Sequence, residues 1–441
     1  MPEFDLLIRG AQPFPEVGIV DGRIAALGSG SARVEMDATG LHVFPGVIDS
    51  HVHFNEPGRA EWEGIATGSQ ALAAGGGTLF FDMPLNAHPP TCDAASFDEK
   101  LAAAKNQSAT DFAFWGGLVP GNLDQLDRLA ERGVVGFKAF MSNSGIEDFS
   151  CVDIVTLKEG MKRAARLGQL VAVHAESERI TGELTRAALA GNRVSIRDYL
   201  DSRPLRAELE AIRCVIELAQ ETKCALHIVH VSSGVGVALV ADAQAQGADV
   251  TCETCPHYLT LTDEDMEKLG AVAKCAPPLR SKPDQTGLWQ CLESGQIATI
   301  GSDHSPSPPD MKRGENFFKV WGGISGGQHA LPLLITEGHG KRNLALSTIA
   351  NLTSLNVARR FRLPQTKGRI AVGADADFAL VDMRQRFTVA KEDLFYRHQQ
   401  SPYVGRMLTG RVVRTILRGQ TIFEDGKIVS PPIGQLVKPA N

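Results

Sequence analysis

Cysteine is scarce in this chain, and the features that would indicate a secreted, membrane-bound or nucleic-acid-binding protein are missing. Eight cysteines among 441 residues are too few for a disulfide framework, which a chain of this length does not need. No apolar run approaches the length of a membrane span, and the acidic N-terminal segment lacks the pattern of a signal peptide. The net charge is −6 and no long basic run occurs, so we expect no nucleic-acid partner. These absences predict a cytoplasmic protein without a membrane partner.

Two motifs that would indicate other chemistry are incomplete or absent. Cys252 and Cys255 form a CxxC, which is compatible with a redox pair or half of a zinc site. Because no second CxxC completes a four-sulfur site, we favour buried thiols near a strand end. No GxGxxG follows an early strand, which argues against a dinucleotide-binding fold.

The middle of the chain alternates strand-like apolar segments with helical patterns. A chain of this length normally forms two or three domains, but alternating β/α barrels run long as single domains. The repeated order strand, helix, strand indicates a parallel sheet, and the number of repeats favours a closed (β/α)8 TIM barrel over an open doubly wound sheet. The expected strands are 43–48, 77–83, 112–117, 134–140, 170–174, 225–230, 249–252 and 297–300, with helices such as 154–167 and 205–221 between them.

The two chain ends have a different pattern, in which short strands are separated by glycine-containing turns. Residues 4–10 and 18–24 predict a strand and a hairpin, with a tight turn at Asp21 and Gly22. Residues 378–382, 412–417, 419–423 and 427–429 repeat this style near the C-terminus. We therefore expect an α/β protein in which residues 1–44 and 365–441 together form a small β-sandwich and residues 45–364 form the barrel.

Polar side chains end several of the expected barrel strands. His51 and His53 follow an apolar run, and residues two apart on a strand point to the same side, so two imidazoles would lie side by side. His227 and His230 fall on opposite faces, and we select His230 because it lies nearer the strand end. Catalytic side chains of such barrels come from the carboxyl ends of the strands. The residues predicted to meet at this rim are His51, His53, Lys138, His174, His230 and Asp303.

Lys138 is the hardest of these residues to explain by structure alone. A buried ammonium carries a large desolvation cost, and a protonated lysine cannot bind a metal. Burial lowers the pKa of a lysine, and the free amine can react with carbon dioxide. The resulting carbamate is a bidentate anion that could bridge two metals.

These segments resemble the amidohydrolase superfamily, in its cyclic-amide branch of dihydroorotases, hydantoinases and allantoinases. The matching segments are 45–53, 136–138, 173–176, 230–233 and 302–306, with 367–370 and 373–377 in the expected sandwich. The resemblance implies two divalent metal ions, one held by His51, His53 and Asp303 and the other by His174 and His230. Carbamylated Lys138 (N6-carboxylysine) would bridge them. Zinc is the expected metal, with cobalt, manganese or nickel as alternatives.

Within this branch the chain resembles the allantoinase group most closely. The segments that carry this resemblance are 56–59, 61–64, 82–86, 303–312, 321–324 and 401–406. Dihydroorotases typically have an arginine where Asn55 stands, which holds the substrate carboxylate, so Asn55 favours uncharged allantoin. The resemblance implies ring opening of allantoin to allantoate in purine breakdown, with Asp303 as the catalytic base and then acid. A hydantoinase or dihydropyrimidinase, or a dihydroorotase, is the alternative. A non-catalytic scaffold is disfavoured because all six ligand positions are filled.

The resemblance also implies substrate contacts and an assembly. Backbone groups near Ala276, Gly322 and Gly323 would face the hydantoin ring, and the Asn86 amide would contact the ureido group. Asn86 is equally compatible with a simple turn residue. Glu176 and His304 would orient metal ligands, whereas His257 would border the site without a direct role. Relatives in this branch are commonly oligomers, so we expect a homo-oligomer, with a tetramer favoured.

Overall fold

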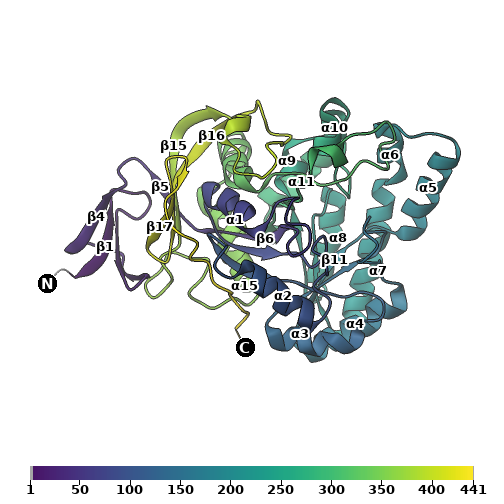
Figure 1. Ribbon diagram of the computed structural model, residues 1–441, viewed down its shortest axis with the longest axis horizontal. Coiled ribbons are helices and arrows are strands. Elements are labelled where there is room, and N and C mark those ends of the chain that lie inside the picture. The colour runs from purple at the N-terminus through teal and green to yellow at the C-terminus, as the bar shows by residue number, and fades with distance from the viewer. Residues whose placement is uncertain (1–2, 441) are drawn as a thin grey trace.

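The computed structural model describes residues 3–440 and consists of a barrel and a smaller β-sandwich (Figure 1). In the first sheet of the sandwich the strand order is β3-β2-β1-β4. Its strands are β1 (Phe4–Arg9), β2 (Glu16–Val20), β3 (Arg23–Ala26) and β4 (Ala32–Asp37). Asp21 and Gly22 join β2 to β3 with φ of 48° and 74°, the positive values that a type I′ hairpin turn requires. The predicted hairpin is therefore confirmed.

The second sheet of the sandwich combines a strand from the N-terminal segment with four from the C-terminal segment. Its order is β18-β17-β16-β15-β5. The strands are β5 (His42–Pro45), β15 (Phe378–Thr388), β16 (Met407–Leu417), β17 (Gln420–Glu424) and β18 (Lys427–Ile428). Ile8 and Val17 of the first sheet and Phe378, Leu380 and Ile416 of the second are buried in one apolar cluster. Both chain ends thus build one sandwich, as predicted, and the proposed barrel domain, residues 45–364, begins at the last residue of β5.

The predicted strand 43–48 is wrong in one respect, because the structure divides it at Gly46. Residues before Gly46 pair with β15 in the sandwich, whereas those after it pair with β7 in the barrel. The Gly46 N–H donates to Asp377 O at 2.9 Å, and an added Cβ would lie 2.1 Å from Oγ1 of Thr78. Only glycine therefore fits where the chain passes from one domain to the other.

The barrel strands are parallel and form two hydrogen-bonded groups, β6-β7-β8 and β14-β13-β12-β11-β10-β9. The strands are β6 (Val47–Val52), β7 (Gly77–Asp82), β8 (Asp111–Phe114), β9 (Gly116–Gly117), β10 (Phe137–Phe140), β11 (Leu170–His174), β12 (Ala225–Ile228), β13 (Val250–Thr254) and β14 (Thr299–Ile300). β8 and β9 continue one strand across Trp115, so eight strand positions enclose the barrel. A parallel bridge between Val52 and His304 joins the last position to the first.

Helices surround these strands on the outside (Figure 1). The α-helices are α1 (Ile65–Ala74), α2 (Ala94–Ala104), α3 (Leu126–Arg132), α4 (Ile154–Arg166), α5 (Glu178–Ala190), α6 (Ile196–Ser202), α7 (Leu205–Thr222), α8 (Gly234–Ala245), α9 (Pro256–Thr260), α10 (Asp263–Leu269), α11 (Lys282–Glu293), α12 (Ala330–Leu334), α13 (Gly340–Arg342), α14 (Leu346–Ala350) and α15 (Asn356–Arg360). Short turns of other helix types are η1 (Leu123–Gln125), η2 (Gly270–Ala273), η3 (Pro309–Lys312), η4 (Gly327–His329), η5 (Ile335–His339), η6 (Asn351–Leu355) and η7 (Lys391–Asp393).

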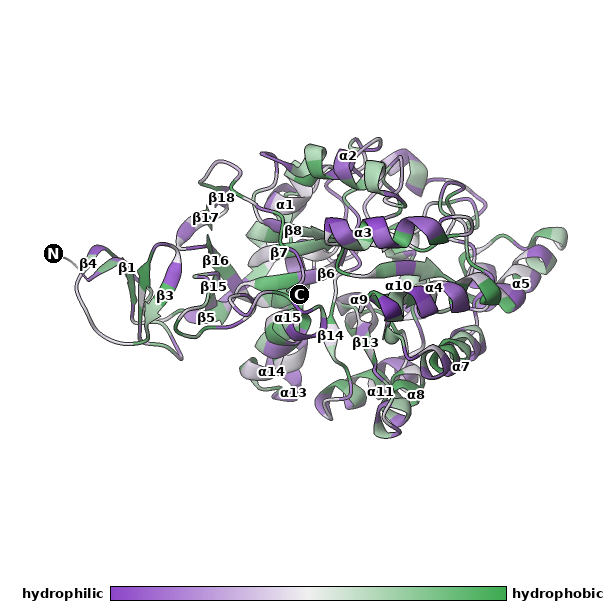
Figure 2. Cartoon of the chain, turned by 90° about the horizontal axis from the view of Figure 1, so that it is seen from below, coloured by the Kyte–Doolittle hydropathy of each residue, from purple (hydrophilic) through white to green (hydrophobic). Residues whose placement is uncertain are grey.

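Apolar burial explains this arrangement. Every residue of β6, β7 and β11 is buried, which is typical of parallel strands covered by helices. α3 and α4 carry many of their polar residues on the outside (Figure 2).

Cys252 and Cys255 are fully buried free thiols, as the sequence favoured. No described helix is both long and apolar enough to cross a membrane.

Candidate metal centre and substrate cavity

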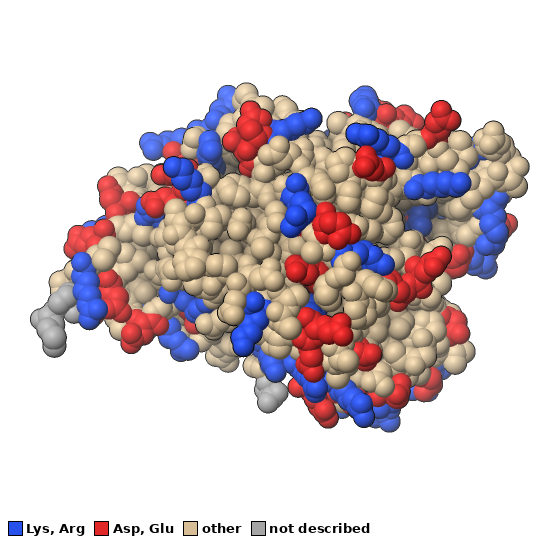
Figure 3. Space-filling view, in the orientation of Figure 1, with Lys and Arg blue, Asp and Glu red and all other residues tan. Residues whose placement is uncertain are grey.

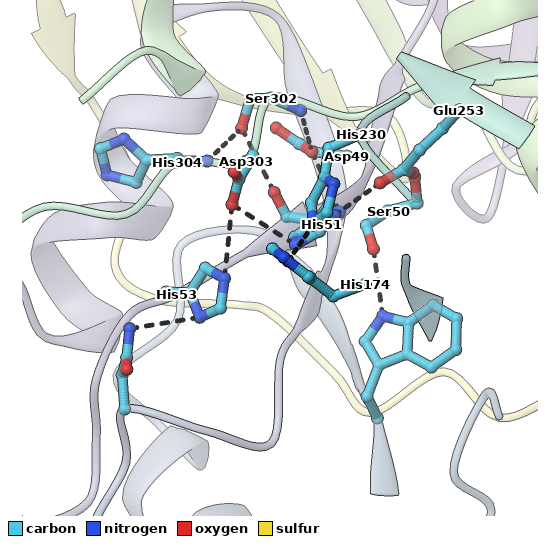
Figure 4. Close-up of polar contacts among 12 residues, drawn as sticks. Asp49, Ser50, His51, His53, His174, His230, Glu253, Ser302, Asp303 and His304 are labelled. Atoms are coloured by element: carbon cyan, nitrogen blue, oxygen red, sulfur yellow. Dashed lines mark hydrogen bonds and ion pairs between the residues drawn. The ribbon is translucent and has the colours of Figure 1, made fainter. Parts of the chain in front are cut away.

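Two histidines and an aspartate form a compact polar cluster at the carboxyl ends of the barrel strands. Nε2 of His51 and Nε2 of His53 each lie 3.4 Å from Oδ1 of Asp303 (Figure 4). Ligand atoms of the three side chains lie within 4.8 Å of one another. All three side chains are at most 13% exposed. The spacing on the first strand therefore places the two imidazoles side by side, as predicted.

Asp303 is held in this cluster by the backbone around it. It follows β14, has a positive φ of 46°, and places its carboxylate 3.4 Å from the imidazoles of His51 and His53. The buried Asp49 carboxylate accepts hydrogen bonds from the N–H groups of Ser302 (2.9 Å) and His51 (3.2 Å). It thereby ties the segment before Asp303 to the strand that carries the histidines.

His174 and His230 form a second cluster beside the first. His174 ends β11 and His230 follows β12, and Nδ1 of His174 lies 3.1 Å from Nε2 of His230. Nε2 of His174 is 2.8 Å from the Glu176 carboxylate, which orients the ring. With that nitrogen donating to Glu176, the lone pair on Nδ1 faces His230. These two imidazole nitrogens thus lie within hydrogen-bond distance of each other.

Lys138 lies in β10 and is completely buried. Among the described residues its Nζ has no hydrogen-bond partner, and it sits 4.6 Å from the centroid of the Phe140 ring. Burial lowers the pKa of Lys138 to about 7, although the charges of Asp303 and Glu253 oppose this shift. A large fraction of the amine is therefore uncharged near neutral pH.

The electrostatics of both clusters favour cation binding. Burial lowers the pKa of the His53, His174 and His230 imidazoles, so the rings are neutral at neutral pH and keep a free lone pair. For Asp303, burial opposes ionisation, but the adjacent imidazoles of His51 and His53 outweigh it and lower the pKa to about 2. Neutral imidazoles beside an ionised carboxylate suit zinc and similar divalent metals.

Glu253 was missed in the sequence analysis. It lies in β13, and its Oε1 is 2.5 Å from Nδ1 of His51. Its Oε2 accepts a hydrogen bond from the Ser50 hydroxyl at 2.9 Å and lies 3.5 Å from Nε2 of His227. The adjacent imidazoles of His51 and His227 outweigh the effect of burial and hold the pKa of Glu253 well below its usual range. The sequence signal that could have identified Glu253 is its position as the one charged residue of the otherwise uncharged strand β13.

A cavity of about 720 Å³ opens above the clusters. Its lining includes the predicted residues His51, His53, Asn86, His174, His230, Ala276, Asp303, Gly322 and Gly323, but not Lys138. The Asn86 amide lies 3.5 Å from Nδ1 of His53 and is 5% exposed, so it faces the first cluster. The structure therefore brings all these residues to one site, with Lys138 buried outside the cavity lining.

The cationic side chains that line the cavity interior are already engaged. Arg203 contacts the Glu176 carboxylate, and Nζ of Lys274 donates to two backbone carbonyls. Arg186 and Lys319 are exposed. Asn55 does not line the cavity, because its amide donates to Pro306 O at 3.3 Å. The described residues that line the cavity thus offer no buried free cation to a substrate carboxylate.

Comparison with known proteins agrees with this geometry. Residues 42–422 match the amidohydrolase family. Allantoinase from Rubrobacter xylanophilus is 57% identical, with 100% of this chain and 98% of that protein covered. Allantoinase from Deinococcus radiodurans is 52% identical, with 99% of each covered. The solved L-hydantoinase (dihydropyrimidinase) from Arthrobacter aurescens superposes with a TM-score of 0.95 at 33% identity, covering 99% of this chain and 100% of that chain.

The chain therefore belongs to the amidohydrolase family, whose members are hydrolases that use a metal centre. Within that family it belongs with the allantoinases, to which it is similar over its full length. The fold class is α/β, with the TIM barrel and β-sandwich that the sequence predicted. Among the described residues, His51, His53 and Asp303 form a group that could hold a metal ion.

Proposed function

We propose that this hydrolase opens the hydantoin ring of allantoin to give allantoate, a step of purine breakdown. The observation that carries the proposal is the full-length similarity to curated allantoinases at 57% and 52% identity. The position of His51, His53 and Asp303 in the wall of a cavity large enough for a small heterocycle supports it.

We further propose two metal sites. His51, His53 and Asp303 would hold one ion, and His174 and His230 the other, with Lys138 as a bridging carbamate formed from carbon dioxide. Zinc suits this donor set best, and cobalt, manganese or nickel also fit. Bound there, such ions would make water more acidic and polarise the ring carbonyl. The unpartnered Lys138 amine, whose pKa burial lowers to about 7, and the close approach of the His174 and His230 nitrogens support this assignment.

Asp303 is the proposed base and acid. Its pKa of about 2 leaves it ionised at neutral pH, so it can accept a proton from the attacking water. The water oxygen bonds to the ring amide carbon, the carbon–nitrogen bond breaks, and Asp303 returns the proton to the departing nitrogen. The product carries a new carboxylate and a new N–H.

Substrate recognition would come from neutral groups. Backbone groups near Ala276, Gly322 and Gly323 would face the hydantoin ring, and the Asn86 amide would contact the ureido group. Lys274 and Arg203 in the cavity are already bound to other protein groups, so neither is free to pair with a substrate carboxylate. An unpaired buried carboxylate is costly, which supports uncharged allantoin over dihydroorotate as the substrate.

A comparison of kcat/KM on allantoin, hydantoin, dihydrouracil and dihydroorotate tests the assignment. Allantoin should be the best of the four substrates. A hydantoinase or dihydropyrimidinase is the second candidate, supported by the TM-score of 0.95 to the Arthrobacter hydantoinase. Far faster turnover of hydantoin or dihydrouracil than of allantoin would favour that candidate instead.

We also propose a cytoplasmic homotetramer without a nucleic-acid partner. Lysine, arginine and acidic side chains are interspersed on the face that Figure 3 shows, with no broad patch of one sign there. Mass measurement by light scattering checks the assembly, and a mass other than four subunits would overturn the tetramer.

A further inference from the structure

One wall of the cavity is a loop, residues 317–323, that carries Gly322 and Gly323. Lys274 holds this loop from the cavity side. Its Nζ donates to Phe317 O at 2.6 Å and to Val320 O at 2.5 Å. Its own backbone oxygen accepts a hydrogen bond from Gly323 N at 2.7 Å. Lys274 thus binds both ends of the loop.

Lys312 holds the same loop from a position outside the cavity lining. It ends η3, and its Nζ donates to Trp321 O at 3.1 Å and to Gly323 O at 2.6 Å. The Trp321 N–H donates to Met311 O at 2.8 Å. Two lysines therefore occupy four of the loop's backbone carbonyl oxygens.

Neither lysine has a carboxylate partner within 4 Å among the described residues. The Lys274 ammonium instead lies over the rings of Tyr199, at 4.4 Å, and Phe317, at 5.0 Å. Burial lowers the pKa of Lys274 and of Lys312 to about 7. Lys274 is buried and Lys312 is partly buried, and among the described residues the Nζ of each hydrogen-bonds only to carbonyl oxygens of the loop, so these contacts fix where the loop backbone lies.

Loop 317–323 also packs tightly at its C-terminal end, where Gly323 lies next to the segment that follows Asp303. Gly323 has a φ of 122°, and an added Cβ would lie 2.2 Å from Ser305 O, two residues beyond Asp303. The Ser305 N–H donates to Ile324 O at 2.9 Å. A shift of the loop would therefore move the glycines relative to Asp303.

We propose that Lys274 and Lys312 are positioning residues that fix loop 317–323 in the conformation that presents the Gly322 and Gly323 backbone to the substrate. The inference rests on the proposed function. It links segments 303–312 and 321–324 in this structure, because Lys312 of the first binds two carbonyls of the second. It also assigns to Lys274 a role other than binding a substrate carboxylate, although Lys274 lines the cavity.

Lys312→Met tests the proposal in the full-length, metal-loaded protein, with Lys312→Arg as the conservative variant. Arg313→Met is the matched control, since Arg313 is exposed and pairs only with the exposed Asp310 among the described residues. Hydrogen exchange of peptides covering 317–324 should speed up about tenfold in Lys312→Met and stay unchanged in Arg313→Met. KM for allantoin should rise about tenfold while kcat and metal content change less than threefold. Lys312→Arg should recover part of the loss.

The two readouts separate this inference from the proposed function. If wild-type protein does not hydrolyse allantoin, the proposed function fails, but the exchange measurement still tests the lysine contacts. Unchanged exchange in Lys312→Met would overturn the inference. So would faster exchange with an unchanged KM, because the loop would then not position substrate. If Lys312→Met does not fold, Lys312→Gln with the same readouts replaces it.

Discussion

The carboxylate of Glu253 lies 2.5 Å from Nδ1 of His51, and both side chains are 1% exposed. This contact fixes the ring so that its other nitrogen, Nε2, faces Asp303 at 3.4 Å. A carboxylate behind an imidazole sets the tautomer and raises the basicity of the ligating nitrogen. The two side chains come from β6 and β13, so the geometry depends on the closed barrel.

Replacing Glu253 by Gln should weaken metal binding, because the amide supports the His51 ring less strongly. We expect affinity to fall about 10–100-fold, measured by competition with a chromogenic chelator. Glu221→Gln, an exposed glutamate paired with Lys158, should leave affinity unchanged. Equal affinity in wild type and Glu253→Gln would show that the contact does not tune the metal site.

Asp303→Asn should abolish proton transfer, since the amide cannot act as a base. We expect kcat on allantoin to fall about 10²–10⁴-fold, with the metal content of the same samples determined by mass spectrometry. Asp310→Asn, at an exposed position, serves as the control. A Asp303→Asn protein with near wild-type kcat would rule out the assigned role.

Lys138→Ala should remove the bridging carbamate and with it the activity. Addition of a short-chain carboxylic acid should restore part of the turnover, because its carboxylate can occupy the space vacated by the lysine side chain. The measurement is the initial rate against acid concentration. If the rate stays at background while the metal content remains at the wild-type level, the bridging role is wrong.

Glu63 makes stability depend on pH. Burial raises its pKa from 4.5 to about 8, although the Arg397 N–H and the charge of Arg397 oppose the shift. The folded protein therefore binds this proton more tightly than the unfolded chain, so its contribution to stability is present below about pH 4.5 and is lost as pH rises toward about 8. The melting temperature of Glu63→Gln should rise relative to that of wild type as the pH increases from about 5 to about 9. A constant difference across this range would contradict the prediction.

The sequence predicted the features that depend on simple periodicity. Residues two apart on a strand share a face, so His51 and His53 could be paired, and the helix expected at 205–221 is observed as α7, Leu205–Thr222. The strand expected at 378–382 continues to Thr388 in the structure. The prediction ended too early because the second half of the strand is polar and its pairing is irregular between Asp382 and Arg386. An apolar pattern does not detect such a solvent-exposed extension.

Contacts that depend on tertiary packing could not be predicted. Glu253 meets His51 across 202 positions of the sequence, and only barrel closure brings them together. Lys274 and Lys312 bind backbone carbonyls, and carbonyls are present at every position, so no residue pattern marks their acceptors. The division of the expected strand at Gly46 could not be predicted either. It arises because the residues before Gly46 pair with β15, which comes from the other end of the chain.

The most direct test of the central claim is the fate of allantoin in water enriched in oxygen-18. The metal-loaded protein should yield a product heavier than allantoin by one water, with a single labelled oxygen in the new carboxylate, and chelation of the metal should stop its formation. Absence of this product, or its formation at the same rate after complete metal removal, would contradict the account.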